Sequence, residues 1–161
     1  MDDFIHQQGP AFLAHLLRRI SDELVGGAAE WYPEAGVNAA PRTTSTLLAL
    51  AEYGPLGVTE IAALLRQSHP LVIDWVRQLK KDGFIRARID VKDRRRTLIA
   101  LTAKGHTEVG RLREALKTMN EASQQLMNAA SSGLFDALWR MEEACRRTPF
   151  AQQLRACGGS G

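Results

Sequence analysis

The side chains best suited to binding chemistry lie in one short basic run. Lys92, Arg94, Arg95 and Arg96 surround a single acid, Asp93. A guanidinium group is permanently charged and presents a planar set of N–H donors that fits phosphate oxygens. The run is therefore a candidate contact for a polyanion, and a solvated charged loop is the plain alternative.

The distribution of charge supports the first interpretation. The chain has 161 residues, with 21 Lys and Arg against 18 Asp and Glu, for a net charge of +3. Residues 66–104 hold eleven bases and four acids, whereas residues 1–65 hold three bases and eight acids. A basic surface concentrated in one third of a chain is typical of proteins that bind nucleic acid.

A second candidate group lies just before the basic run, on a helix predicted from Ser68 to Asp82. Ser68 is a favourable N-cap, and Gly83 is suited to end the helix. The apolar stripe expected to face the core consists of Val72, Trp75, Val76 and Leu79. The side chains expected to face outward, where they are available for contacts, are His69, Pro70, Leu71, Ile73, Asp74 and Arg77.

The rest of the chain has a mostly helical pattern. Apolar residues recur at helical spacing in several further segments, and two short segments have the composition of strands. Gly26-Gly27 is expected to end the first helix, and residues 33–41 are predicted to be a connection. The predicted helices cover 10–25, 43–53, 57–65, 68–82, 103–127 and 131–147, and the predicted strands, the first of them half-buried, cover 85–90 and 97–101.

This order of elements predicts a mostly α-helical fold with a small β-hairpin: a winged helix-turn-helix flanked by dimerisation helices. A turn at Arg66-Gln67 joins the two helices of the motif, and the second of them should enter the major groove of DNA. The long apolar faces outside the motif favour a twofold partner. The predicted organisation is a dimerisation helix and connection at 1–40, the winged motif at 41–102, dimerisation helices at 103–157 and a flexible tail at 158–161.

Several of these segments resemble the MarR family of multiple-antibiotic-resistance-type regulators. Residues 90–96 (DVKDRRR), followed by 101–105 (LTAKG), are similar to the wing signature of the family. Residues 59–62 (TEIA) and 79–85 (LKKDGFI) are similar to its helix-turn-helix signals. The start at 68–72 (SHPLV) resembles a subgroup whose recognition helix opens with His-Pro.

The resemblance implies a homodimer that binds a pseudo-palindromic operator in double-stranded DNA, usually as a repressor. By position, the helix that starts at Ser68 would read bases, Arg95 would be the wing arginine, and Asp93 would orient it. Many members release DNA when a small anionic or aromatic effector binds. The residues placed near the corresponding cleft are His15, Trp31 and Tyr32, and for the two aromatic residues the alternative is simple packing at a helix junction.

The recognition helix departs from the family pattern. Pro70, Leu71, Ile73 and Asp74 stand where many members have small hydroxyl residues and a base. Leu71 and Ile73 can contact thymine methyl groups, and a carboxylate can accept a hydrogen bond from cytosine N4 but repels phosphate. Asp74 can also pair with Arg77 one turn later. These departures keep an alternative function open: an interaction or architectural module with weak or non-specific DNA binding.

No catalytic or metal-binding constellation stands out. The chain lacks a nucleophile–base–acid order, a phosphate-binding loop and a convergent pair of carboxylates, so we expect it to need no cofactor and not to be an enzyme. The histidines lack the paired spacing of metal ligands, and no metal site is expected among them; they are His6, His15, His69 and His106.

The cysteine count and hydropathy favour a cytoplasmic protein. Cys145 and Cys157 are too few for a disulfide framework, which suggests a reducing compartment. Cys145 falls on the apolar face of its predicted helix and is expected to be a buried structural thiol. No apolar run approaches the ~20 residues that a membrane-spanning helix needs.

Overall fold

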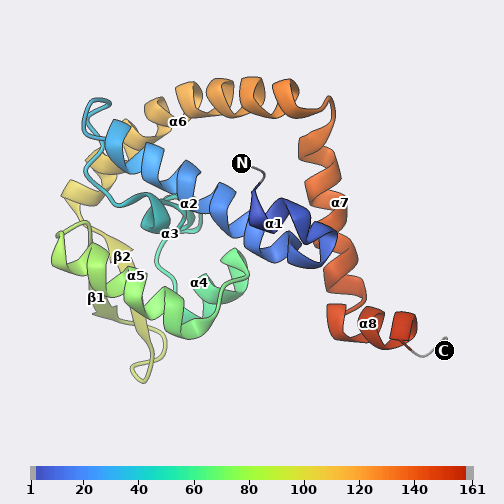
Figure 1. Ribbon diagram of the computed structural model, residues 1–161. Helices are drawn as coiled ribbons and strands as arrows, with labels where there is room; N and C mark the ends of the chain where they lie inside the picture. The colour runs from blue at the N-terminus through green and yellow to red at the C-terminus, as the bar shows by residue number, and fades with distance from the viewer. Residues whose placement is uncertain (1–2, 159–161) are drawn as a thin grey trace. The chain divides into compact units, whose positions relative to one another are not determined.

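The computed structural model describes residues 3–158, which form two compact units (Figure 1). The first unit runs to Ala115 and the second begins at Leu116. The first contains α1 Phe4–Gln7, the 3₁₀ turn η1 Gly9–Phe12, α2 Leu13–Trp31, the 3₁₀ turn η2 Pro41–Thr43, α3 Thr44–Tyr53, α4 Val58–Leu65, α5 His69–Lys81, β1 Ile85–Ile89 and β2 Thr97–Leu101. Helix α6 Ala103–Ala130 begins in the first unit and ends in the second, which also holds α7 Leu134–Arg147 and α8 Phe150–Gly158.

The core of the first unit lies between α3, α4, α5 and the inner end of the hairpin. Leu47, Ile61, Val72, Leu79 and Phe84 are each no more than 1% exposed. The predicted stripe on α5 is confirmed, because two of its members are fully buried and the other two, Trp75 and Val76, pack against this cluster. The predicted fold class is confirmed as well, since residues 3–158 are mostly helical with a two-stranded antiparallel sheet.

The hairpin is buried at its base and exposed along its outer part. Ile85 pairs with Leu101 and Ile89 pairs with Thr97. In β2 the four residues Leu98–Leu101 are buried, whereas in β1 only Ile85 is. The prediction of a half-buried first strand is therefore wrong beyond Ile85, because the hairpin extends past the core and projects as a wing (Figure 1).

A close backbone contact fixes the start of α6 against the base of the wing. The hydroxyl of Thr102 donates to the carbonyl of Gly83 (2.7 Å) and accepts from the N–H of Gly105 (3.0 Å), so Thr102 caps the start of α6. A Cβ atom on Gly105 would lie 2.0 Å from the carbonyl oxygen of Phe84. Only glycine allows this approach, so α6 begins in contact with the chain entering β1.

A buried carboxylate anchors the connection between α2 and α3 to α6. Glu108 is 1% exposed, and its Oε1 accepts hydrogen bonds from the backbone N–H groups of Asn38 and Ala39, the latter at 2.7 Å. Arg111 lies 3.7 Å from the other carboxylate oxygen. Glu108 thereby satisfies two backbone N–H groups of the connection, which have no partner within a helix.

The first long helix departs from its predicted bounds. Helix α2 passes through Gly26-Gly27 and ends at Trp31. Each glycine costs a helix only about 1 kcal/mol relative to alanine, and the good helix formers that follow carry α2 past them. Before α2, Asp3 caps the short helix α1 by accepting from Ile5 N–H at 2.9 Å and pairs with Arg19 at 2.6 Å, a feature that the sequence did not predict.

The second unit consists of the end of α6, α7 and α8. Cys145 is exposed, so the prediction of a buried thiol is wrong. The reason is that its face of α7 remains open, with Leu138 and Met141 each more than a third exposed. Helix α8 was not predicted; it begins directly after Pro149 and includes Gly158, and the rest of the predicted flexible tail, 159–161, lies outside the described residues.

Within residues 3–158, no helix combines the length and the apolar character required to cross a membrane.

Candidate nucleic-acid interface

Helices α4 and α5 form the helix-turn-helix that the sequence predicts. The turn contains Arg66, whose φ of 52° is left-handed, and the N–H of Gln67 donates to the carbonyl of Ala62 at 3.0 Å. This conformation and hydrogen bond form a left-handed cap that ends α4. The chain changes direction there before α5 begins. Helix α5 packs on α4 and places Val72 and Leu79 in the core, while its other side stays open.

The open side of α5 carries apolar and charged groups together. Leu71 and Ile73 are 38% and 37% exposed. Asp74 and Arg77 are largely exposed and form an ion pair of 2.6 Å between Oδ1 and Nη1. The i, i+3 pair allowed by the sequence therefore exists, and it leaves the second carboxylate oxygen and the rest of the guanidinium group facing outward.

The first turn of α5 contacts α4. Ser68 is the N-cap residue, as predicted, although its side chain makes no capping hydrogen bond. The Nε2 atom of His69 lies 3.5 Å from the hydroxyl of Thr59, and both side chains are exposed. Pro70 follows within the first helical turn. The start of α5 is thus held by its neighbour and presents a polar edge.

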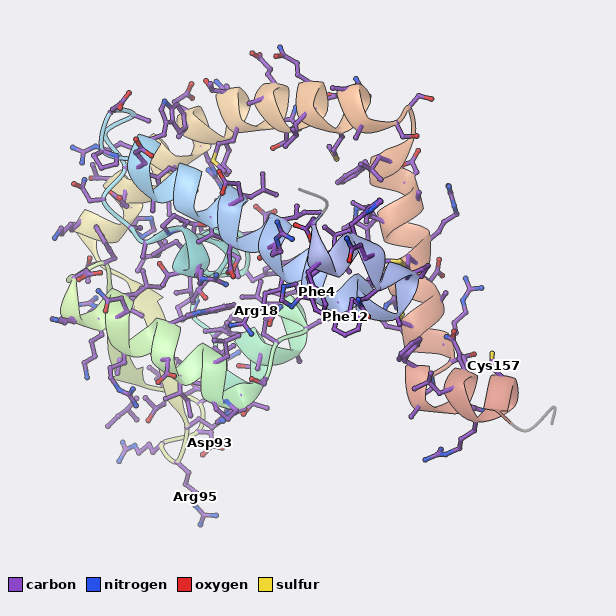
Figure 2. The ribbon with its side chains drawn as sticks, in the orientation of Figure 1. Phe4, Phe12, Arg18, Asp93, Arg95 and Cys157 are labelled. Atoms are coloured by element: carbon purple, nitrogen blue, oxygen red, sulfur yellow. The ribbon has the colours of Figure 1, made fainter. Side chains whose placement is uncertain are left out.

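Hydrogen bonds within the turn set the shape of the wing tip. The carboxylate of Asp93 accepts from the backbone N–H of Arg95 (3.0 Å), and the Asp93 carbonyl accepts from the N–H of Arg96 (2.9 Å). Asp90 accepts from the N–H of Lys92 at 2.9 Å. Asp93 therefore holds the backbone of Arg95 rather than its guanidinium group, which extends from the tip (Figure 2).

Arg96 differs from the two arginines before it. Its Nη2 atom lies 2.8 Å from Oε1 of Glu60 on α4, and its Nη1 atom lies 3.8 Å from Asp90. No acid of the described chain pairs with the guanidinium groups of Arg94 or Arg95. The carboxylates of Glu60 first, and then of Asp90 and Asp93, raise the pKa of Arg96 above its usual value.

Glu60 is held from two directions. Its Oε2 atom accepts from the N–H of Gly57 at 2.7 Å, which caps the start of α4 from its third residue. That hydrogen bond first, and then the bond from Arg96, lower the pKa of Glu60. The spacing Gly57-x-x-Glu60 is the sequence signal that could have indicated this cap, but no local pattern indicates the partner on the wing.

The structure does not bring the three predicted effector contacts together. Trp31 and Tyr32 end α2 with ring centroids 6.4 Å apart, whereas His15 lies sixteen residues earlier on the same helix, about 24 Å along its axis. Tyr32 is 3% exposed. Burial raises the pKa of Tyr32, and a hydrogen bond with the side chain of Thr44 opposes that shift in part.

A winged helix-turn-helix that presents an exposed helix face and a basic wing defines a class of DNA-binding fold. The sequence model of the MarR family matches residues 41–97, from the start of η2 to the first residue of β2. The resemblance drawn from the sequence is confirmed, and this segment is a MarR-family winged helix. Regulators of this family are DNA-binding proteins that are not enzymes.

Solved structures show the same fold over most of the chain. A probable transcriptional regulator from Pseudomonas aeruginosa is 24% identical with a TM-score of 0.65, covering 80% of this chain and 96% of its own. MepR of S. aureus, solved in complex with DNA, is 22% identical with a TM-score of 0.66, covering 82% of this chain and 96% of its own.

A third structure is that of PcaV, a transcriptional regulator from Streptomyces coelicolor solved with its natural ligand. It is 20% identical with a TM-score of 0.66, covering 91% of this chain and 99% of its own. At these identities the likeness shows the fold alone. No curated protein has a significant sequence match to this chain.

Proposed function

We propose that the protein is a homodimeric, ligand-responsive repressor that binds a pseudo-palindromic operator. The observation that carries this proposal is the placement of α5 and the wing on one unit, each with groups that fit DNA. Leu71, Ile73, Asp74 and Arg77 stand on the open side of α5. Arg94 and Arg95 extend the same unit with guanidinium groups that no described acid neutralises.

The two elements would divide the work of binding. The first turn of α5, from Ser68 to Pro70, and the open side of the helix would meet base edges in the major groove. Arg95 would enter the minor groove, where a narrow groove concentrates negative potential. Lys92 and Arg94 would contact phosphates, which position the protein without reading sequence.

A dimer is proposed because both units expose many apolar side chains. Scattered exposed apolar residues are ordinary, but large contiguous sets mark association surfaces. On the N-terminal helices the exposed residues are Phe4, Phe12, Leu13, Leu16, Ile20 and Leu24. On the second unit they are Leu126, Phe135, Leu138, Trp139, Met141, Phe150 and Leu154.

The effector would be a small aromatic or anionic molecule that binds outside the DNA-contact face. Trp31 is partly exposed at the end of α2 and is the group that we assign to it. Tyr32 is assigned to the core, because its hydroxyl is buried and bonded to Thr44. His15 stays a separate candidate on the exposed part of α2. We place the protein in the cytoplasm, where its DNA would lie and where Cys145 and Cys157 would stay reduced.

The second candidate function is an interaction or architectural module. It is favoured by the open side of α5, because a carboxylate and two aliphatic side chains make poor phosphate contacts. The test is DNA binding to the duplex upstream of the protein's own gene and to a scrambled duplex of the same composition, at about 150 mM salt. Tight binding to the first and weak binding to the second supports the repressor. Equal binding to both, or binding to neither, supports the module.

A further inference from the structure

The wing of this protein is tied to helix α4 through a chain of three groups. Arg96, the last residue of the wing turn before β2, pairs with one oxygen of Glu60, and the other oxygen of Glu60 accepts from the backbone N–H of Gly57. We name Arg96, Glu60 and the N–H of Gly57 the wing clasp. Both charged side chains are 47% exposed, so the clasp is reachable by water but held at both ends.

The backbone beside the clasp is bonded to the wing. Leu56, next to Gly57, pairs with Ile99 of β2 through two hydrogen bonds of 3.1 and 2.7 Å. A Cβ atom on Gly57 would lie 3.1 Å from Oε2 of Glu60 and 3.9 Å from Nη2 of Arg96. The residues just before α4, the middle of β2 and the clasp are therefore neighbours.

The three consecutive arginines consequently have separate environments. Arg96 faces acids on both sides, Glu60 at 2.8 Å and Asp90 at 3.8 Å. Asp90 also accepts from the N–H of Lys92, so it braces the wing turn from within. Arg94 and Arg95 precede Arg96 in the wing turn, and Arg95 points away from the unit (Figure 2).

We propose that Arg96 is a positioning residue for DNA binding and not a DNA contact. Through Glu60 it holds the wing at a set angle to the helix-turn-helix, so that Arg95 and the open side of α5 meet one duplex together. This proposal rests on the proposed function, because a positioning role for Arg96 requires that the protein binds DNA. It replaces the expectation from the sequence that Arg96, as part of the basic run, contacts DNA.

The two roles predict opposite effects for one variant. If Arg96 contacts phosphate, Glu60 competes for it, and Glu60→Gln should leave DNA affinity unchanged or make it tighter. If Arg96 positions the wing, Glu60→Gln should weaken binding, because the ion pair is lost. Gln retains a carbonyl oxygen that can accept from Gly57, so the cap of α4 is kept in this variant.

The binding experiment uses the full chain and a duplex selected from a random pool, over a series of salt concentrations. Arg96→Ala and Glu60→Gln should each weaken binding about two- to fivefold, the range that an exposed ion pair supplies. The double variant should bind no more weakly than Arg96→Ala alone, and Arg96→Lys should restore part of the affinity. The slope of log affinity against log salt should stay that of the wild type in Arg96→Ala.

Three outcomes would overturn the proposal. A slope in Arg96→Ala that is flatter by about 0.9 would identify a phosphate contact. Unchanged or tighter binding by Glu60→Gln would also identify Arg96 as a phosphate contact. Unchanged binding by Arg96→Ala would mean that the clasp does not contribute to DNA binding. Arg94→Ala is the comparison variant for a phosphate contact: it removes the same charge from a neighbouring position without an acidic partner, and its slope should be flatter by about 0.9.

A second measurement needs no DNA and separates this proposal from the proposed function. A nitroxide label is placed on Val91→Cys, at a wing residue that is 93% exposed, after Cys145 and Cys157 are changed to serine. The electron paramagnetic resonance spectrum of the label reports the mobility of the wing, and a more mobile wing gives narrower lines. Arg96→Ala and Glu60→Gln should both narrow the lines, and Arg94→Ala should leave them unchanged. Equal line widths in all variants would show that the clasp does not hold the wing, even if the protein binds its operator. Narrowed lines would show that it does, even in a protein that binds no operator.

Discussion

Asp74 and Arg77 form an ion pair of 2.6 Å on the open side of α5, one turn apart. A pair of this kind contributes only ~0.2–0.5 kcal/mol to an isolated helix, so its main consequence is geometric. The carboxylate holds the guanidinium group against the helix surface and brings a negative charge to a face that would meet DNA. We therefore expect this pair to affect the sequence specificity of DNA binding.

We expect Asp74→Asn to raise affinity for scrambled DNA and to relax sequence preference. Removing one charge about 7 Å from a phosphate in water changes the interaction by roughly 0.6 kcal/mol, or about threefold. The measurement is a binding series on selected and scrambled duplexes at two salt concentrations. Asp82→Asn, at the opposite end of the same helix, is the control for loss of charge alone. Loss of binding to both duplexes in Asp74→Asn would point to a structural or partner-binding role and favour the interaction module.

Two wing residues should contribute differently to DNA binding, Arg95 to sequence-dependent binding and Lys92 to electrostatic attraction for any duplex. Arg95→Ala is expected to weaken binding to the selected duplex by about 1–3 kcal/mol without unfolding the protein, as the loss of a groove contact would. Lys92→Ala is expected to weaken binding to every duplex and to flatten the salt dependence by about 0.9. If both variants bind like the wild type, the DNA does not contact the wing.

Local spacing was sufficient to predict the helix-turn-helix and the wing. Ser68, Gly83 and the apolar stripe between them define α5 by signals a few residues apart, and the order of helices and strands follows from similar signals. The clasp was not predictable in this way, because Glu60 and Arg96 are joined only by tertiary structure. The error at Gly26-Gly27 has a different cause, because it is local: two weak helix breakers lie among residues that favour a helix.

The exposed apolar residues predict a dimer in solution. Interfaces of obligate dimers usually bury more than ~2,000 Å², and both units expose side chains suited to one. Sedimentation at micromolar concentration should give about twice the mass of one chain. Leu16→Glu and Leu24→Glu, on α2, should shift the protein toward the monomer, whereas Val91→Glu, on the wing, should not. A monomeric wild type would contradict the proposed architecture.

Glu108 should contribute strongly to stability because of what it satisfies. Its removal in Glu108→Ala would leave the N–H groups of Asn38 and Ala39 without their acceptor, at about 1–3 kcal/mol for each donor that stays buried. Glu108→Gln, which keeps one carbonyl oxygen, should cost less. Urea unfolding should show a lower midpoint with an unchanged slope. Glu121→Ala, an exposed position on the same helix, is the control, and an equal effect there would show that the buried bonds contribute little.

The last prediction concerns Tyr32 and alkaline pH. Burial raises the pKa of its phenol above the ordinary value of 10.0, so the folded chain keeps a proton that the unfolded chain releases. The stabilisation from this group is therefore fully present below pH 10 and is lost as the pH rises through the folded pKa. In Tyr53→Phe, which leaves Tyr32 as the only tyrosine, absorbance at the phenolate band should titrate at higher pH in the folded protein than in concentrated urea. Tyr32→Phe should abolish the difference in alkaline stability that this proton creates. Equal midpoints in the folded and unfolded protein would mean that the hydroxyl is accessible to solvent, and Tyr32 would then return as a candidate contact for the effector beside Trp31.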